Sequence, residues 1–188
     1  SGAMMVAKSE LAYTVMKRAF KERTIEKVYH AVVAGHLDPA SGTIDAPIGR
    51  HPSREWRMAV IDGGKRAVTH YDTLELMAGA QLTEVHLETG RTHQIRVHLA
   101  HIGCPICGDY LYGRELPELK DRFALHSARL RCVQPVTGKT VEVVEPLPEE
   151  LKALLTPSAF CAEFASSALA GISALNTSLL EGGGTTKS

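Results

Sequence analysis

The order of hydrophobic and polar positions along the chain predicts many strands and few helices. A helix is expected from Ser9 to about Glu22, because Ser9 is a favourable N-cap and apolar residues then recur at helical spacing. Strand-like patterns lie near residues 27–34, 42–48, 57–61, 65–76, 81–88, 128–133 and 140–144. Since strands and helices do not alternate regularly, we expect an α+β fold with a mainly antiparallel mixed sheet and flanking helices.

A polar segment that begins at Gly90 interrupts the strand pattern. It predicts a helix that continues to about Ile102, with Thr89 and Thr92 as candidate N-caps and Gly103 as the C-terminal cap. A further helix is expected to open within residues 146–151 and to end at Pro157.

The two ends of the chain differ in character from its middle. The apolar residues 3–7 suggest a strand already under way, so we expect the chain to start inside a longer domain. Residues 158–180 are rich in Ala and Ser and predict one weakly amphipathic helix, and residues 181–188 read as a flexible tail. The expected organisation is a domain over residues 1–155 and an appendage over residues 156–188.

Composition and charge narrow the classes of protein. The 188 residues are 44% hydrophobic, which excludes full disorder, and the net charge is zero. The charged side chains are unevenly distributed along the chain. The first 140 residues hold 19 basic and 15 acidic side chains, and the last 48 hold 2 basic and 6 acidic ones. An anionic partner for the front of the chain is therefore one interpretation, and an uneven solvated surface is the other.

Cysteine content and hydropathy indicate where the protein works. Four cysteines are ordinary intracellular usage, and no apolar run approaches the ~20 residues of a membrane span. The N-terminus lacks the features of a signal peptide. We therefore expect a soluble cytoplasmic protein.

The densest candidate chemistry lies between residues 90 and 101. His93 and Arg96 stand three residues apart on the expected helix, so both can face one ligand. Arg91 and Arg96 supply donors suited to carboxylate or phosphate, and a helix N-terminus also favours an anion. The alternative is an exposed polar helix face without a ligand.

A metal or redox site is a further alternative. His98, His101, Cys104 and Cys107 recur every three residues, and the last two form a Cys-x-x-Cys pair. A single pair without a second one is a weak signal, and Pro105 breaks the helix between the histidines and the cysteines. Buried, inert thiols are therefore the favoured interpretation.

Two further segments carry modest signals for nucleic-acid binding. Trp56 lies among Arg50, Arg54 and Arg57, and an aromatic ring in a basic segment can stack on a base. Tyr29 lies in a basic neighbourhood but equally fits a half-buried strand tyrosine. The chain contains no nucleophile elbow, P-loop or dinucleotide fingerprint.

The longest motif resembles that of a known enzyme family. The run 87–98, Leu-Glu-Thr-Gly-Arg-Thr-His-Gln-Ile-Arg-Val-His, continues through Gly-Asp-Tyr-Leu-Tyr-Gly at 108–113. Together with residues 26–35, 67–71 and 125–128, it resembles the RluA/RluD-type pseudouridine synthases over residues 1 to about 151. The resemblance implies the α+β fold of their catalytic domain and isomerisation of uridine to pseudouridine in RNA, without cofactor or metal.

The resemblance also implies roles for particular residues. In the family pattern His-Arg-Leu-Asp-x-x-Thr-Ser-Gly, Ser1 and Gly2 match the last two positions, so the catalytic Asp falls four residues before Ser1. Tyr29 matches the tyrosine that packs against the flipped uracil, and Arg96 matches the arginine that pairs with the catalytic Asp. His93, Gln94 and Arg91 are then expected to bind the substrate.

The expected partner is RNA, with ribosomal large-subunit RNA first and transfer RNA as the alternative. Because the Asp is absent, this chain alone is expected to be inactive, and a non-catalytic RNA-binding fragment is the rival interpretation. From charge alone, the candidates for contacting the RNA backbone are Lys17, Arg18, Lys21, Arg50, Arg54 and Arg57.

Overall fold

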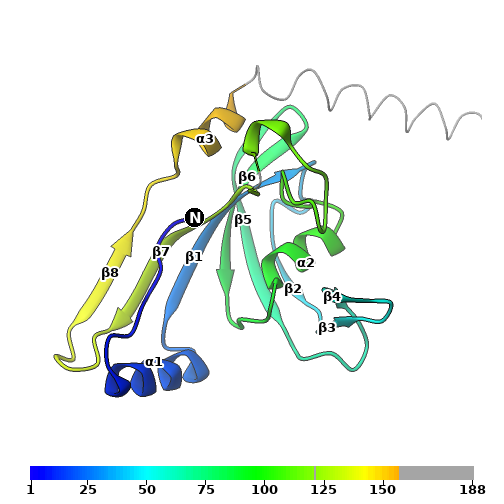
Figure 1. The fold of residues 1–188 in the computed structure, drawn as a ribbon. Helices are drawn as coiled ribbons and strands as arrows, with labels where there is room; N and C mark the ends of the chain where they lie inside the picture. The colour runs from blue at the N-terminus through cyan, green and yellow to red at the C-terminus, as the bar shows by residue number, and fades with distance from the viewer. Residues whose placement is uncertain (121, 157–188) are drawn as a thin grey trace, which may run out of the picture.

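A six-stranded antiparallel sheet organises the computed structural model, which describes residues 1–120 and 122–156. The strand order is β2-β5-β6-β1-β7-β8, and every neighbouring pair of these strands is antiparallel. Their bounds are β1 Glu26–Ala34, β2 Ser41–Asp45, β5 Val68–Met77, β6 Ala80–Leu87, β7 Leu125–Val133 and β8 Thr140–Val144. The expected α+β fold with a mainly antiparallel sheet is confirmed (Figure 1).

Short helices flank this sheet. They are α1 Glu10–Glu22, α2 Gln94–His101 and α3 Glu149–Lys152, with the 3-10 turns η1 Pro117–Leu119 and η2 Ala153–Leu155. The main core contains residues of β1, β5 and β6 together with Ile95 and Leu99 of α2 and with Leu151 and Leu154. Helix α1 packs through Met16 against a smaller cluster with Ile25 and Cys132.

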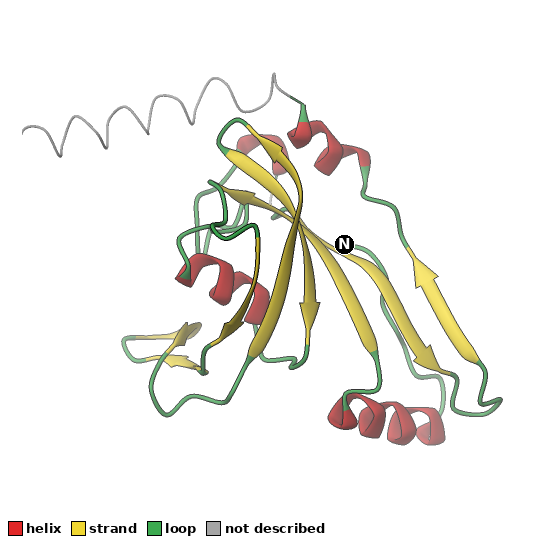
Figure 2. Cartoon of the chain, turned by 180° about the vertical axis from the view of Figure 1, so that it is seen from behind, coloured by secondary structure: helices red, strands yellow, loops and turns green. Residues whose placement is uncertain are grey.

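A separate hairpin stands beside the sheet. It consists of β3 Ile48–His51 and β4 Arg54–Val60, which pair only with each other among the named strands. Figures 1 and 2 show this hairpin and α1 at the same end of the molecule, on opposite flanks. A small cluster of Ile48, Ala67 and Val97 joins the hairpin to the body of the protein.

The helix predicted from Ser9 is confirmed in detail. Ser9 is extended, and its hydroxyl accepts a hydrogen bond from the backbone N–H of Ala12. Arg23 ends α1 in the left-handed conformation, and β1 begins three residues later.

Several expected boundaries differ from those of the structure. The predicted strand over residues 42–48 divides into β2 and β3, because Pro47 between them lacks the N–H needed to continue the ladder. The second helix begins at Gln94 and not at Thr92. Its N-cap residue is His93, whose side chain makes no capping hydrogen bond. Thr89 instead bonds to the backbone of Val68 and to Gln94. The helix expected to open within residues 146–151 begins at Glu149 as α3, and η2 continues it to Leu155.

The expected strand over residues 3–7 is also absent from the described structure. Met4 and Val6 are exposed, so the apolar run does not enter the core. Only Gly2 forms a bridge, and it lies parallel to Ser127 of β7. The helix predicted over residues 158–180 and the tail lie outside the described residues, so the division near residue 155 stays a prediction.

Candidate active site

Gln94 fixes the turn that leads from β6 into α2. Its side chain is buried. Its Oε1 accepts hydrogen bonds from the Thr89 hydroxyl at 2.7 Å and from the backbone N–H of Arg91 at 2.9 Å. Its Nε2 donates to the carbonyl of Val68 and to the hydroxyl of Thr69. These four bonds hold Gln94 in the protein interior, where it shapes the loop over residues 89–93.

His93 stands at the junction of this loop and α2. It adopts the left-handed conformation with φ 55°, and its Nδ1 lies 2.9 Å from the hydroxyl of Tyr112. Burial, and next the neighbouring Arg96, lower the pKa of His93 from its ordinary value. The imidazole is therefore neutral at neutral pH.

Arg96 forms a buried ion pair with Asp109. Its Nε and Nη2 each lie 2.7 Å from a carboxylate oxygen, so the pair is bidentate. Asp109 is fully buried, and its Oδ1 also accepts the backbone N–H groups of Leu111 and Tyr112. Arg96, expected to pair with an aspartate before Ser1, thus has a carboxylate partner within the chain.

Aromatic rings and guanidinium groups continue outward from this pair. The guanidinium of Arg96 lies 4.3 Å from the ring centre of Phe123 and 5.0 Å from that of Tyr112. Arg57 of β4 also lies 5.0 Å from the Tyr112 ring and 5.8 Å from the ring of Trp56. All four distances are within the range of cation–π interactions.

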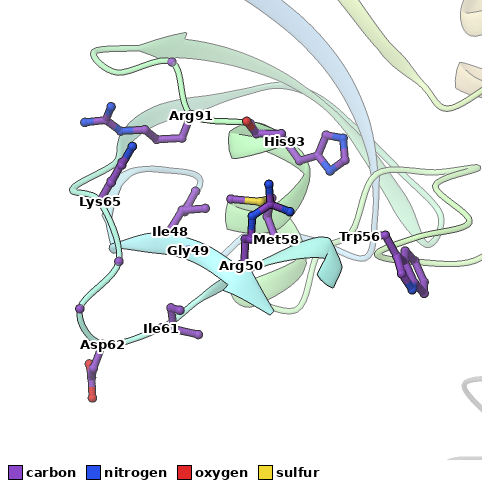
Figure 3. A pocket seen from close by; sticks show the side chains of 14 residues that line it. Ile48, Gly49, Arg50, Trp56, Met58, Ile61, Asp62, Lys65, Arg91 and His93 are labelled. Carbon is purple, nitrogen blue, oxygen red and sulfur yellow. The ribbon is translucent and has the colours of Figure 1, made fainter. Parts of the chain in front are cut away.

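A cavity of about 800 Å³ lies between the β3–β4 hairpin and residues 90–93. Figure 3 shows Lys65 and Arg91 on one side of it and Trp56 on the other, with His93 also on its wall. The side chain of Arg91 is anchored, because its Nε donates to the carbonyl of Arg66 at 3.0 Å. The arrangement combines cationic, aromatic and hydrogen-bonding groups, which suits a nucleotide.

Tyr29 lines a different cavity. It lies on β1 opposite Ser127, and the cavity of about 580 Å³ beside it is bounded by residues 1–5, Phe20, Lys27, Ser127 and Leu130. Burial raises the pKa of Tyr29, so its hydroxyl stays protonated at neutral pH. The structure therefore groups Arg91, His93, Gln94 and Arg96 around the start of α2 and places Tyr29 beside the start of the chain.

The basic candidates fall into two groups. Lys17, Arg18 and Lys21 lie on exposed turns of α1, where Arg18 pairs with Glu22 at 2.7 Å. Arg50, Arg54 and Arg57 lie on the hairpin. Because the two groups occupy opposite flanks of one end of the molecule, they are separate surfaces (Figure 2).

Two residues of the site were missed by sequence reasoning. From the sequence, neither Asp109 nor Tyr112 is assigned a role. Both belong to the run at 108–113 that carries the family resemblance, which was the available signal. Their partners, Arg96 and His93, lie in another segment, so local patterns could not reveal the contacts.

Cys104 and Cys107 are buried free thiols. Burial raises the pKa of both, that of Cys107 to about 12, so the thiolate form needed for zinc binding or disulfide exchange is disfavoured. Within residues 1–120 and 122–156, no group of three or more His, Cys, Asp or Glu residues is placed to hold a metal ion. In the same part of the chain, no helix is long and apolar enough to span a membrane.

Comparison with known proteins finds RNA pseudouridine synthases. A family model described as RNA pseudouridylate synthase matches residues 1–101. An uncharacterised RNA pseudouridine synthase of Mycobacterium bovis is 55% identical over 157 residues, covering 81% of this chain and 51% of that protein. The ribosomal large subunit pseudouridine synthase D of Pseudomonas aeruginosa is 42% identical over 83% of this chain and 52% of that protein. The chain thus spans about half the length of these curated relatives.

Solved structures show the same architecture. The human RNA pseudouridylate synthase domain containing 1 protein superposes with a TM-score of 0.65 at 34% identity, covering 75% of this chain and 62% of the human one. The human RNA pseudouridylate synthase domain containing 4 protein gives a TM-score of 0.62 at 24% identity, covering 78% of this chain and 67% of the human one. At this identity the match shows a common fold.

Proposed function

Because the chain belongs to the RNA pseudouridylate synthase family, we propose that it is part of an enzyme that isomerises uridine to pseudouridine in large-subunit ribosomal RNA. The observation that carries this choice of substrate is the 42% identity to a ribosomal large subunit pseudouridine synthase D over 83% of the chain. We place the enzyme in the cytoplasm, where ribosomal RNA is available. Transfer RNA is the second candidate substrate.

The reaction moves one bond of the nucleoside. The bond between C1′ and N1 breaks, the base turns, and C1′ joins C5, which gives up its proton to solvent while N1 gains one. By the family resemblance, an aspartate four residues before Ser1 acts on the sugar–base unit. Tyr29 packs against the uracil and assists removal of the C5 proton.

The path of the N-terminal segment supports this placement. Gly2 lies parallel to Ser127, and the terminal nitrogen of Ser1 donates to the carbonyl of Leu125. In a parallel pairing, earlier residues lie beside earlier residues, so a segment before Ser1 would extend toward Phe123. The guanidinium of Arg96 lies on the Phe123 ring, so the nucleophile would approach Arg96.

Arg96 retains donors for that carboxylate. A guanidinium has five N–H groups, and the bidentate pair with Asp109 uses two of them. Because Asp109 already balances the positive charge, Arg96 would orient the nucleophile more than it lowers the nucleophile's pKa. His93 and Arg91 then bind the RNA from the cavity wall, with Gln94 supporting their loop.

Release of the C5 hydrogen gives a direct test. The parent protein, carrying the segment before Ser1, is incubated with large-subunit ribosomal RNA or transfer RNA labelled with tritium at C5 of uridine. We expect tritium release from ribosomal RNA by the parent and none by the 188-residue chain alone. Failure of the parent on both RNAs would contradict the proposed activity and favour a non-catalytic RNA-binding protein. Release by the chain alone would contradict the placement of the nucleophile.

Substitution of Tyr29 tests its assigned role. Tyr29→Phe in the parent keeps the ring but removes the hydroxyl, so tritium release should fall at least tenfold while RNA binding is retained. Tyr13→Phe is the matched control, because Tyr13 is exposed on α1. Equal rates for the two variants would remove Tyr29 from proton transfer.

A further inference from the structure

Tyr112 connects three parts of the candidate site. Its hydroxyl lies 2.9 Å from the backbone nitrogen of Met58 on β4 and 2.9 Å from Nδ1 of His93 at the start of α2. Its ring lies 5.0 Å from the guanidinium groups of both Arg57 and Arg96. The proposed function uses His93 and Arg96 but gives Tyr112 no role.

The contact with the hydroxyl bears on which nitrogen of His93 carries the proton. The backbone N–H of Met58 can only donate, so the Tyr112 oxygen accepts from it. The hydroxyl still has its own proton to donate, and Nδ1 of His93 lies 2.9 Å away as an acceptor for it. When the hydroxyl donates to Nδ1, the proton of the neutral imidazole is on Nε2.

The Nε2 proton is available to a ligand. His93 lines the cavity of about 800 Å³ between the hairpin and residues 90–93 (Figure 3). Within the described part of the chain, its Nε2 has no hydrogen-bond partner, whereas Nδ1 is held by Tyr112. His93 thus offers a donor of fixed direction to an acceptor oxygen of bound RNA.

The ring links the hairpin to Arg96. The hairpin pairs with the rest of the described chain through one bridge, Ile48 to Lys65, and packs through a small cluster to which Tyr112 contributes. A two-stranded hairpin has little stability of its own, so its orientation depends on such contacts. Tyr112 holds Arg57 of the hairpin and the buried Arg96 against the same aromatic ring.

We propose that Tyr112 is a positioning residue of the synthase, whose hydroxyl holds His93 with its proton on Nε2 toward the RNA and whose ring aligns the basic hairpin with Arg96. This inference rests on the proposed function for its catalytic consequence. Its structural consequence, the tautomer of His93, holds independently of turnover.

Two substitutions separate the two parts of the proposal. Tyr112→Phe removes the hydroxyl and keeps the ring, whereas Tyr112→Leu removes both. Tyr110→Phe and Tyr110→Leu are the matched controls, because Tyr110 lies in the same loop but is 60% exposed. Each variant is made in the 188-residue chain for spectroscopy and in the parent for kinetics.

Nitrogen-15 NMR of the histidine rings reads the tautomer, with His93→Gln identifying the signal. In the wild-type chain we expect the proton of His93 on Nε2 only. In Tyr112→Phe a signal from the Nδ1–H form should appear, and exchange of the Met58 amide should quicken roughly threefold to tenfold, as for one lost hydrogen bond. A wild-type Nδ1–H form, or no change in Tyr112→Phe, would overturn the role of the hydroxyl.

Kinetics in the parent read the catalytic consequence. Tyr112→Phe should raise KM for RNA about threefold to tenfold with kcat within twofold, because the Nε2 donor of His93 is no longer held toward the bound RNA. Tyr112→Leu should also lower kcat at least tenfold, because Arg96 loses its alignment. A fall in kcat alone, equal in both variants, would indicate a merely structural role and overturn the proposal.

The two proposals fail in different ways. If the wild-type parent releases no tritium from any RNA, the proposed function fails, and the NMR result still decides whether Tyr112 sets the tautomer of His93. If the parent is active and Tyr112→Phe matches Tyr110→Phe in every measurement, only the role of Tyr112 fails.

Discussion

At the scale of single residues, the site is built on buried polar groups that satisfy one another. Arg96 donates two hydrogen bonds to Asp109 in the interior, and Gln94 uses both ends of its amide. A buried group that loses its partner pays the full cost of desolvation. These residues therefore decide stability as well as chemistry, and the two effects need separate controls.

The Arg96–Asp109 pair gives a stability prediction. Asp109→Asn should lower the free energy of unfolding by about 3 kcal/mol or more, because it leaves a buried guanidinium without its counter-charge. Glu22→Gln removes the same charge from the exposed pair with Arg18 and should change the free energy of unfolding far less. Urea unfolding measures both. Similar losses in the two variants would mean that the buried pair is not specially costly to break.

His98 predicts how stability changes with pH. It is fully buried. Its Nδ1 lies within hydrogen-bond distance of the hydroxyl of Thr69, and its Nε2 lies within hydrogen-bond distance of the carbonyl of Ala46. Burial lowers its pKa in the folded state, so the unfolded chain binds more protons below about pH 6.5. Stability should therefore decrease as the pH falls below that value, by up to about 1.4 kcal/mol per unit from this residue.

Urea unfolding at pH 7.0 and pH 5.5 tests whether stability decreases as the pH falls. His98→Gln should be less stable at pH 7.0 but should lose less between the two values than the wild type does. His36→Gln, at an exposed histidine, should keep the wild-type slope. An unchanged slope in His98→Gln would place the acid sensitivity elsewhere.

At the scale of elements, sequence pattern succeeded where the local signal and the tertiary contacts agree. Helix α1 has a serine cap and an apolar stripe, and β1 is a valine-rich run of nine residues, so the sequence predicts both nearly in full. The pattern failed at residues 42–48, because apolar alternation continues across Pro47 while the chain changes sheets. The partners of Asp109 and Tyr112 could not be predicted, because their contacts depend on how the loop folds back on α2.

The two basic elements, the hairpin and α1, border different cavities, and each is expected to contribute to RNA binding. The hairpin borders the cavity that His93 lines, whereas α1 borders the Tyr29 side. Arg54→Gln and Lys21→Gln should each weaken RNA binding and reduce the salt dependence by about one unit of slope if each residue contacts one phosphate. Lys152→Gln on α3 is the control of equal charge. Titrations across salt concentrations that rank all three alike would exclude a specific basic surface.

At the scale of the whole molecule, the sheet and the hairpin are unequal in stability. The sheet has β1 between β6 and β7 and is covered by a core that contains fully buried Ala31, Val32 and Val33. The hairpin pairs its own two strands and is joined to the body by a small cluster, by the bridge from Ile48 to Lys65 and by the contacts of Tyr112. Elements with few buried contacts open at lower free energy than the core does.

Hydrogen exchange should resolve this difference. Amides of Met58 and Val60 in the hairpin are expected to exchange well before those of Val32 and Val85 in the sheet, because the hairpin opens without unfolding the core. Exchange measured by NMR under native conditions gives both rates. A single common rate would mean that the molecule opens as one cooperative unit.

The bridge between Gly2 and Ser127 limits which sequences this family member can tolerate. Gly2 has φ 100°, and a Cβ at this position would overlap the backbone of Ser127. Every side chain is thus excluded on two grounds, and none can be accommodated by a rotamer change. A library randomised at this codon of the parent and selected for rRNA modification should return glycine alone, although the residue carries no chemical group that reacts.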